Sequence, residues 1–213
     1  MGKIIDILSG NEMIDNQIPC LHNGSYQIVL ADPPWTFKTY SKKGKGKSAE
    51  RHYDCMNLDD IAALPIDHIT DKNAALALWV TDPHLQNGIA IMNMWGFTYK
   101  TILHTWVKLN HDQSKNRYVK STGYYTRSNP ECLLLGIKGK MPRFNKNIDQ
   151  IIAEPRREHS RKPDCVRQNL VELFGDLPRI ELFARETVDG WESWGNETTK
   201  FNAEELEIEV ELE

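Results

Sequence analysis

The chain has 213 residues, of which 40% are hydrophobic and 26% are charged, a composition typical of a soluble globular protein with one sizeable core. There is no run of about 18 apolar residues and the first residues are too polar for a signal peptide, so the sequence predicts no membrane span and no leader. The four cysteines form no Cys-x-x-Cys pair, which argues against a disulfide framework or a structural zinc site and favours a reducing, cytoplasmic setting.

The formal net charge of −4 is unevenly distributed along the chain. The last eleven residues, AEELEIEVELE, carry six glutamates, so the remainder has a net charge of about +2. We therefore predict a single domain over residues 1–200 and an acidic, solvated tail over residues 201–213.

Six apolar runs predict β-strands, and several are apolar enough to be covered on both faces. They are residues 26–31, 74–80, 99–108, 131–139, 150–154 and 179–185. Helical patterns occupy residues 57–65, 83–96 and 163–175, with Asn57 as a capping residue and Pro and Gly at other ends. This alternation predicts an α/β fold with a mostly parallel sheet and helices on both faces. In such folds ligands bind beyond the carboxyl ends of the strands.

The first predicted strand ends abruptly in the stretch IVLADPPWTF, residues 28–37. Pro33 and Pro34 cannot donate backbone hydrogen bonds within a sheet, so they hold Asp32 and Trp35 on a stiff loop at the strand tip. The Asp32 carboxylate and the nearby carbonyls only accept hydrogen bonds, and Trp35 offers a flat ring beside them. The loop therefore suits a flat heterocycle with an exocyclic amine, such as adenine, while a purely structural strand-end turn stays open.

Two basic segments are predicted to flank this loop. Residues 38–51 hold six basic residues against one acidic residue, which fits either a phosphate-contacting arm or a flexible surface loop. Residues 110–130 interleave aromatic and basic side chains, as nucleic-acid contacts do, but an ordinary long loop or a subunit contact fits equally well. The candidate nucleic-acid contacts are Lys42, Lys43, Lys45, Lys47, Arg117, Lys120, Tyr124, Tyr125 and Arg127.

A series of fragments carries a family resemblance. They are ADPPW, HYDCMNLDDI, LALWVT, MWGF, TWVK, NPECLLLGIKG, EPRREHSRKPD, RIELFAR and WGNE, all between residues 26 and 200. In this order they resemble the family of the eukaryotic messenger-RNA adenine-N6 methyltransferase catalytic subunit, which also contains small bacterial and phage DNA adenine methyltransferases. The resemblance implies a Rossmann-like methyltransferase domain over residues 1–200. It also implies transfer of a methyl group from S-adenosylmethionine to the exocyclic N6 amine of adenine.

The same resemblance implies a catalytic pocket formed by Asp32, Pro33, Pro34, Trp35 and Tyr53. Asp32 and a carbonyl near Pro33 would accept the two N–H groups of the target amine, which frees the nitrogen lone pair for attack. Asp32 would also stabilise the positive charge that develops on that nitrogen. Trp35 would stack on the base, which must flip out of a duplex first. This chemistry requires no metal.

The cofactor contacts implied by the resemblance are Asp6, Ile7, Asp32, Lys162, Arg185, Asn196 and Glu197. Lys162 would meet the methionine carboxylate, and Arg185 would lie beside the ribose and the methionine tail. Asn196 and Glu197 would contact the ribose and adenine, although eukaryotic relatives have an amide where Glu197 stands. Asn129 and Glu131 match a neighbouring family segment, in which Glu131 either orients the pocket or pairs with a loop arginine.

We expect DNA to be the substrate, because the chain is compact, shows no RNA-binding signature and resembles the small bacterial and phage enzymes. Adenosine in RNA is the alternative substrate. A non-catalytic scaffold subunit is a further alternative, which the presence of both Asp32 and Trp35 disfavours. Homodimers and heterodimers both stay open, and the sequence does not show which nucleotide sequence is recognised.

Overall fold

The computed structural model describes residues 25–35, 56–112, 114, 116–158 and 160–202. Several residues of the predicted site lie outside this described part, as does the acidic tail from residue 203 onward. They are Asp6, Ile7, Tyr53, Lys42, Lys43, Lys45 and Lys47.

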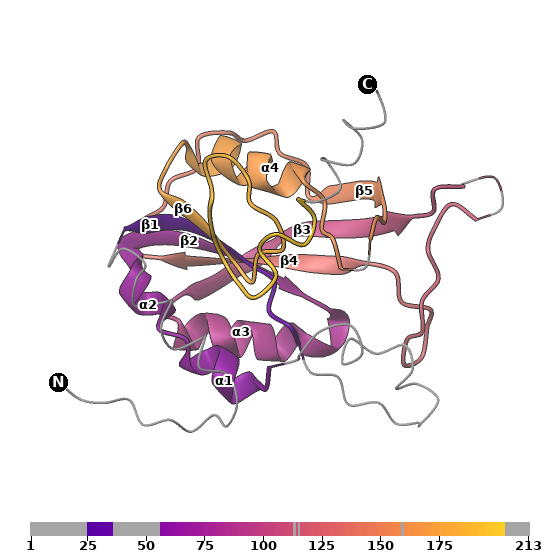
Figure 1. The fold of residues 1–213 in the computed structure, drawn as a ribbon, viewed down its shortest axis with the longest axis horizontal. Helices are drawn as coiled ribbons and strands as arrows, with labels where there is room; N and C mark the ends of the chain where they lie inside the picture. The colour runs from indigo at the N-terminus through magenta and orange to yellow at the C-terminus, as the bar shows by residue number, and fades with distance from the viewer. Residues whose placement is uncertain (1–24, 36–55, 113, 115, 159, 203–213) are drawn as a thin grey trace.

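A seven-stranded sheet in the order β5-β3-β4-β2-β1-β6-β7 forms the centre of the molecule (Figure 1). The strands are β1 (Tyr26–Ala31), β2 (Thr70–Val80), β3 (Thr98–Leu109), β4 (Glu131–Lys138), β5 (Ile151–Pro155), β6 (Arg179–Leu182) and β7 (Glu192–Trp194). Strand β4 runs antiparallel to both of its neighbours, and the other four pairings are parallel. The sheet is therefore mostly parallel, as the sequence predicts. The start of β4 lies at the same edge as the ends of β1, β2 and β3.

Helices cover both faces of the sheet (Figure 1). One face carries α1 (Leu58–Ala63) and α3 (Leu85–Met94), and the other carries α4 (Cys165–Phe174). Two short elements complete the first side, α2 (Ile66–Ile69) and the 3₁₀ turn η4 (Asp82–His84). The predicted N-cap of α1 is confirmed, because the Asn57 side chain accepts a hydrogen bond from the Asp60 amide.

Each face of the sheet has its own apolar cluster. Under α1 and α3 the cluster includes Ile61, Met92 and Trp95, and the Trp95 indole donates a hydrogen bond to the Ile61 carbonyl at 3.1 Å. Under α4 the cluster includes Leu170 and the paired indoles of Trp79 and Trp106. The helices thus hold the carboxyl ends of β1 and β2 from both sides. Asp32 directly follows the end of β1. No helix among the described residues is long and apolar enough to cross a membrane.

Candidate active site

The loop after β1 is anchored by the tryptophan that ends it. The Trp35 indole donates a hydrogen bond to the Trp79 carbonyl at 3.0 Å and stacks on His84 with a centroid distance of 5.3 Å. The side chain is only 4% exposed. Its burial differs from our expectation of a ring stacked on the target base. In this structure Trp35 holds the loop against β2 and does not offer an open face.

The backbone of the loop is held at two further points. The Pro33 carbonyl accepts a hydrogen bond from the Trp35 amide at 2.9 Å, and the Pro34 carbonyl accepts one from the Met56 amide at 3.1 Å. A carbonyl oxygen has two lone pairs, so each keeps the capacity to accept a second bond. The loop is thus preorganised and still has acceptors left for a ligand.

Asp32 lies at one end of a chain of four alternating charges. Its Oδ2 is 2.7 Å from the Lys162 ammonium, and the same ammonium is 3.4 Å from Glu131 Oε2. The other oxygen of Glu131 forms a short ion pair with Lys108. The four side chains are 17–20% exposed. We name Asp32, Lys162, Glu131 and Lys108 the charge chain.

The charge chain holds Glu131 and Lys162 in their ionised forms. Burial alone raises the pKa of Glu131, but the ammonium groups of Lys162 and Lys108 outweigh it and lower that pKa to about 2. Burial alone lowers the pKa of Lys162, and the carboxylates of Asp32 and Glu131 outweigh it, so the pKa rises above its ordinary value. Lys162 is therefore a permanent cation beside Asp32.

Two indoles lie beside the charge chain. The Lys162 ammonium is 5.6 Å from the centre of the Trp79 ring, and the Lys108 ammonium is 5.1 Å from the centre of the Trp106 ring. The two rings meet edge to face at 6.4 Å. Ammonium groups are attracted to the faces of such rings, so the indoles help to fix both lysines.

A second group of predicted residues follows β6 and β7. Arg185 Nε is 3.7 Å from Glu197 Oε2, and Glu197 also pairs with Lys200 at 2.6 Å. Asn196 is exposed beside them. The positive charge of Arg185 also acts on Lys162 and partly offsets the rise in the Lys162 pKa that the carboxylates of Asp32 and Glu131 cause. The structure thus brings Arg185 and Glu197 together, within electrostatic reach of the charge chain.

Two backbone positions beside these groups are unusual. Among the described non-glycine residues, only Ser160 and Phe183 have positive φ, at 68° and 60°. They stand two positions before Lys162 and Arg185 respectively. Bulky residues such as phenylalanine rarely adopt this conformation, and such outliers concentrate at functional sites. The strain thus marks the two turns that carry the predicted cofactor contacts.

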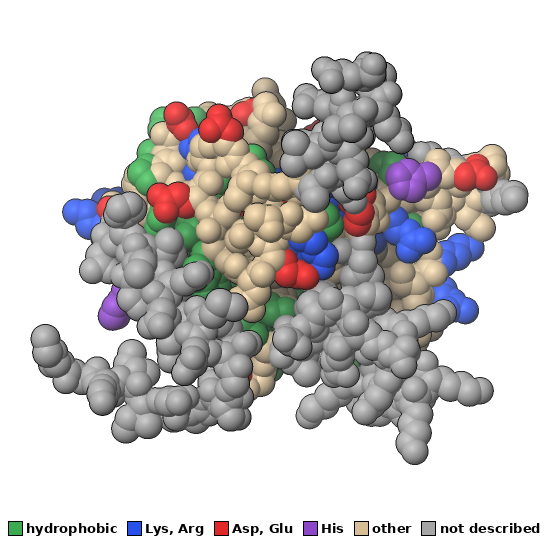
Figure 2. Space-filling model, in the orientation of Figure 1, with side chains coloured by type: hydrophobic (Ala, Val, Ile, Leu, Met, Phe, Trp, Pro, Cys, Tyr) green, Lys and Arg blue, Asp and Glu red, His purple; other side chains and the backbone are tan. Residues whose placement is uncertain are grey.

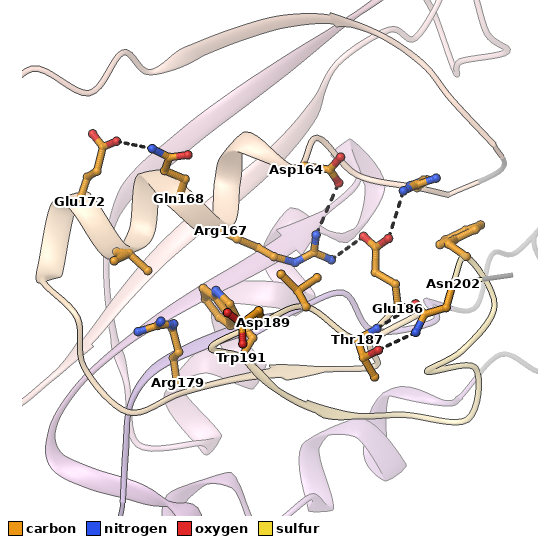
Figure 3. Close-up of a pocket in the computed structure, with 14 residues that line it drawn as sticks. Asp164, Arg167, Gln168, Glu172, Arg179, Glu186, Thr187, Asp189, Trp191 and Asn202 are labelled. Atoms are coloured by element: carbon orange, nitrogen blue, oxygen red, sulfur yellow. Dashed lines mark hydrogen bonds and ion pairs between the residues drawn. The ribbon is translucent and has the colours of Figure 1, made fainter. Parts of the chain in front are cut away.

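A polar hollow of about 1050 Å³ lies nearby but is a separate feature (Figure 3). It lies between α4 and residues 186–191, and its arginines are already paired with carboxylates. Arg167 contacts Glu181 at 2.7 Å and Glu186 at 2.9 Å, while Glu186 also pairs with Arg161. Its lining residues include no member of the charge chain. The paired arginines make it a less suitable ligand site than the edge around Asp32.

The side-chain amide of Asn129 helps to tie the segment 110–130 to the end of β3. Asn129 Oδ1 accepts from the Lys108 amide at 3.0 Å, and its Nδ2 donates to the carbonyls of Lys108 and Val119 at 2.9 and 2.7 Å. Beyond this clamp the candidate contacts are all exposed, and Arg117 lies over the Tyr118 ring at 5.6 Å. Figure 2 shows basic side chains on this flank of the molecule. The exposed candidates are Arg117, Lys120, Tyr124, Tyr125 and Arg127.

The sequence identified three members of the charge chain and missed the one at the end opposite Asp32. Asp32 and Lys162 meet as members of one site, and Glu131 pairs with two lysines, whereas the alternative was a loop arginine. Lys108 was missed, although it ends the fragment TWVK on which the resemblance partly rests. A basic residue that closes an apolar strand at the ligand-binding edge is the signal that could have found it.

No group of three or more potential metal ligands occurs in the part of the chain that the structure describes.

Known proteins resemble this chain over most of its length. The MT-A70 family model matches residues 26–197. Type II methyltransferase M.MunI of Mycoplasma sp is 33% identical over 201 residues, which cover 86% of this chain and 82% of the relative. Two eukaryotic proteins match 82% of this chain but only about a quarter of their own length. They are the N(6)-adenosine-methyltransferase MT-A70-like protein of Arabidopsis thaliana, 33% identical, and the human N(6)-adenosine-methyltransferase catalytic subunit METTL3, 30% identical.

Proposed function

The chain belongs to the MT-A70 family of adenine-N6 methyltransferases, and from this premise we propose that it methylates the N6 amine of adenine in DNA with S-adenosylmethionine as cofactor. The observation that carries the proposal is the position of Asp32. It follows β1 at the ligand-binding edge of a mostly parallel sheet, and its carboxylate is ion-paired with a lysine from the segment before α4.

The charged groups at this edge fit the proposed cofactor. An amino-acid tail carries one carboxylate and one ammonium group, and the site presents the Lys162 ammonium and the Asp32 carboxylate side by side. Gly195 lies so close to the turn after β6 that a Cβ there would be 2.9 Å from backbone atoms of Ala184. This close approach keeps the ends of β6 and β7 together, where Arg185 and Glu197 meet. We assign the methionine carboxylate to Lys162 and the ribose to these two residues.

The chain's own contribution to the reaction is to bind and polarise the target amine. The amine of adenine is a weak nucleophile because its lone pair is delocalised into the ring. Asp32 and the Pro33 carbonyl are acceptors at adjacent positions, so they can take both N–H groups and favour a pyramidal nitrogen. The Asp32 carboxylate then stabilises the positive charge that develops there. The bound cofactor supplies an electrophilic methyl group.

The Lys162 ammonium also orients the Asp32 carboxylate. Because the ammonium is 2.7 Å from Oδ2, one carboxylate oxygen is already engaged and the other remains for the amine. The ion pair also keeps Asp32 from rotating. The pair thus orients the acceptor before the substrate arrives, which reduces the reorganisation that the transition state requires.

Residues 110–130 supply the surface that we assign to nucleic acid. Tyr124 is 66% exposed and Tyr125 is fully exposed, so both rings are available for stacking on bases. Arg117, Lys120 and Arg127 supply cations for phosphates. Asn129 holds the base of this segment against the main chain of Lys108, a member of the charge chain, and this link to the site supports the assignment.

The preference for DNA rests on two supports. The sequence resembles small bacterial and phage DNA adenine methyltransferases, and the Type II methyltransferase M.MunI is matched over 82% of its length. The relatives named as N(6)-adenosine-methyltransferases are matched over about a quarter of theirs. Adenosine in RNA remains the second candidate substrate, because these relatives share the same 30–33% identity.

The deciding experiment measures methylated nucleosides. The full chain is incubated with isotopically labelled S-adenosylmethionine and either duplex DNA or RNA, and the digested products are analysed by mass spectrometry. We expect labelled N6-methyldeoxyadenosine. Labelled N6-methyladenosine from RNA alone would replace the DNA assignment with the RNA one. No labelled adenine from either polymer, at cofactor concentrations that bind the protein, would refute the proposed activity.

A further inference from the structure

Lys108 completes the charge chain without contacting Asp32, and its role is not explained by the proposed chemistry. We propose that Lys108 is a positioning residue that keeps Glu131 ionised when Lys162 turns from Glu131 to the carboxylate of the cofactor. The inference rests on the proposed function, because it requires a carboxylate ligand at Lys162. The structure shows Lys162 before this exchange of partners, in contact with both Asp32 and Glu131.

The contacts of Lys162 show which partner it can give up. An ammonium has three N–H donors, and the Lys162 group already serves Asp32 Oδ2 at 2.7 Å, the Ser160 carbonyl at 3.4 Å and Glu131 Oε2 at 3.4 Å. A further acceptor must displace one of these. The contact with Asp32 is the short one, and Asp32 is needed beside the target amine. Glu131 has a second ammonium in Lys108, so its contact with Lys162 is the one that can be released.

The charge on Glu131 after this release depends on what surrounds it. A buried carboxylate that loses its cations becomes harder to ionise and takes up a proton. With Lys108 in place, Glu131 keeps one close ion pair, and the Trp106 ring on the same strand helps to hold that ammonium in position. Lys162 can therefore change partners without any proton entering the site.

The charged groups around Glu131 come from several elements, and none of the others replaces Lys108. Asp32 at the end of β1 and Arg185 after β6 both act on Lys162. The neighbouring thiol of Cys132 has a pKa raised by burial, so it stays neutral near pH 7. The groups that act on Glu131 or are acted on by it are thus Lys108 from β3, Lys162 from the segment before α4 and the Cys132 thiol, while Asp32 and Arg185 act on Lys162.

The test compares proton uptake on cofactor binding in the wild type and in Lys108→Met. S-Adenosylhomocysteine, which carries the same carboxylate, is titrated into each full chain by calorimetry in two buffers of different ionisation enthalpy, between about pH 6 and pH 8. The wild type should show little uptake that depends on Glu131. Lys108→Met should take up as much as one additional proton per bound ligand. Its affinity should then fall by up to about tenfold for each pH unit of increase, because the complex binds more protons than the free protein.

Three variants separate this role from a purely structural one. Asn129 binds the main chain of Lys108, so Lys108→Met leaves that clamp in place. Lys108→Arg should restore the wild-type proton count. The double variant Lys108→Met with Glu131→Gln should remove the additional uptake, because no titratable group is left at that position. This double variant also removes both charges of the pair, so it gives an informative result even if Lys108→Met is unstable.

The outcomes distinguish this inference from the proposed function. If the wild type binds the ligand and Lys108→Met shows the same proton count at every pH, the role of Lys108 is refuted while the proposed function stands. If the wild type itself takes up a proton that Glu131→Gln removes, the role is refuted as well. If the wild type does not bind S-adenosylhomocysteine, the proposed function fails, and this inference fails with it.

Discussion

The face of the sheet under α1 and α3 differs in chemistry from the face under α4. Between the first two helices and the sheet, the packing is made by apolar side chains such as Ile61, Met92 and Trp95. On the α4 face, an apolar cluster is bordered by ion pairs that are largely removed from water, such as Arg167 with Glu181 and Lys162 with Glu131. The face under α1 and α3 is thus held by apolar packing, whereas the face under α4 combines apolar packing with charged groups.

The difference shows how a small domain can contain a partly buried charged site and still be stable. Removing an ion pair from water costs free energy that the attraction between the partners only partly restores. Such groups are retained where they serve recognition or chemistry, provided that other packing maintains the fold. The predictions below test this division of roles, beginning with the apolar face.

Truncating the apolar face should cost the most. Trp95 is 1% exposed and its indole is hydrogen-bonded to Ile61, so Trp95→Ala should lower the free energy of unfolding by about 3–5 kcal/mol. Denaturant unfolding measures this loss. The neighbouring Met94 is 67% exposed, and Met94→Ala should change stability by less than about 0.5 kcal/mol. Equal losses in the two variants would mean that this face is not the main source of stability.

On the charged side, Asp32→Ala should affect activity far more than stability. Loss of the carboxylate that accepts the target amine should lower the rate of methyl transfer by about 10²–10³-fold, measured with labelled cofactor. Cofactor affinity should fall only modestly. Asp189→Ala, at an exposed aspartate beside the α4 hollow, is the matched control and should retain full activity. Full activity of Asp32→Ala would refute the proposed mechanism.

The cations of the exposed segment 110–130 should contribute to DNA binding. Changing Arg117, Lys120 and Arg127 to Gln should weaken DNA binding and flatten its salt dependence. Each lost phosphate contact should reduce the magnitude of the negative slope of log affinity against log salt by about 0.9. Fluorescence anisotropy at several salt concentrations gives this slope. A slope equal to that of the wild type would show that these cations face only solvent.

Lys162→Ala should weaken cofactor binding by roughly tenfold, the equivalent of one charge-assisted contact of about 1.4 kcal/mol. Titration calorimetry with S-adenosylhomocysteine measures the change. Lys140 is exposed and remote from the charge chain, so Lys140→Ala should bind normally. Unchanged affinity in Lys162→Ala would remove the lysine from the cofactor site.

The smallest effect is a pH dependence that comes from a histidine under α4. His104 is 1% exposed, with Nδ1 3.0 Å from the Asp149 carbonyl and Nε2 3.4 Å from the Asn169 amide. Burial lowers its pKa, so the unfolded chain binds the proton more readily than the folded one. Its contribution should be fully present above about pH 6.5 and should be lost as the pH falls towards the lower pKa of the folded state.

The histidine effect is measured as a difference between two proteins. Unfolding free energies of the wild type and of His104→Gln are compared from about pH 7.5 down to pH 5. The wild type should lose stability more steeply, by at most about 1.4 kcal/mol per pH unit. Because the burial of His84 also lowers its pKa, only the difference between the two curves reports on His104. Parallel curves would contradict the assignment.

The fold could be predicted largely because its strands carry continuous apolar runs. The strand expected at residues 99–108 is observed as Thr98–Leu109, and the one expected at residues 26–31 is observed unchanged. Elements that are too short to show a period were missed. These are α2, with four residues, and β7, with three.

The candidate site could be predicted only in part, because its contacts are long-range. Asp32 and Lys162 stand 130 positions apart, and the resemblance proposed them as separate contacts without pairing them. Lys108 and Glu131 are 23 positions apart on neighbouring antiparallel strands, and their meeting depends on the register of β3 and β4. The motif identified Trp35, but its burial against His84 and β2 follows from packing that local sequence does not encode.

The clamp formed by Asn129 has a consequence for how this protein can diversify. One side chain joins both ends of the segment that leaves β3 and returns to β4, so the register of these strands is set outside the excursion itself. The entropy of closing a loop changes only slowly with its length. Residues between the clamp points can therefore be lengthened, shortened or exchanged between relatives while Glu131 keeps its position. The surface that we assign to nucleic acid can therefore vary in length and sequence independently of the site that contains Asp32 and Glu131.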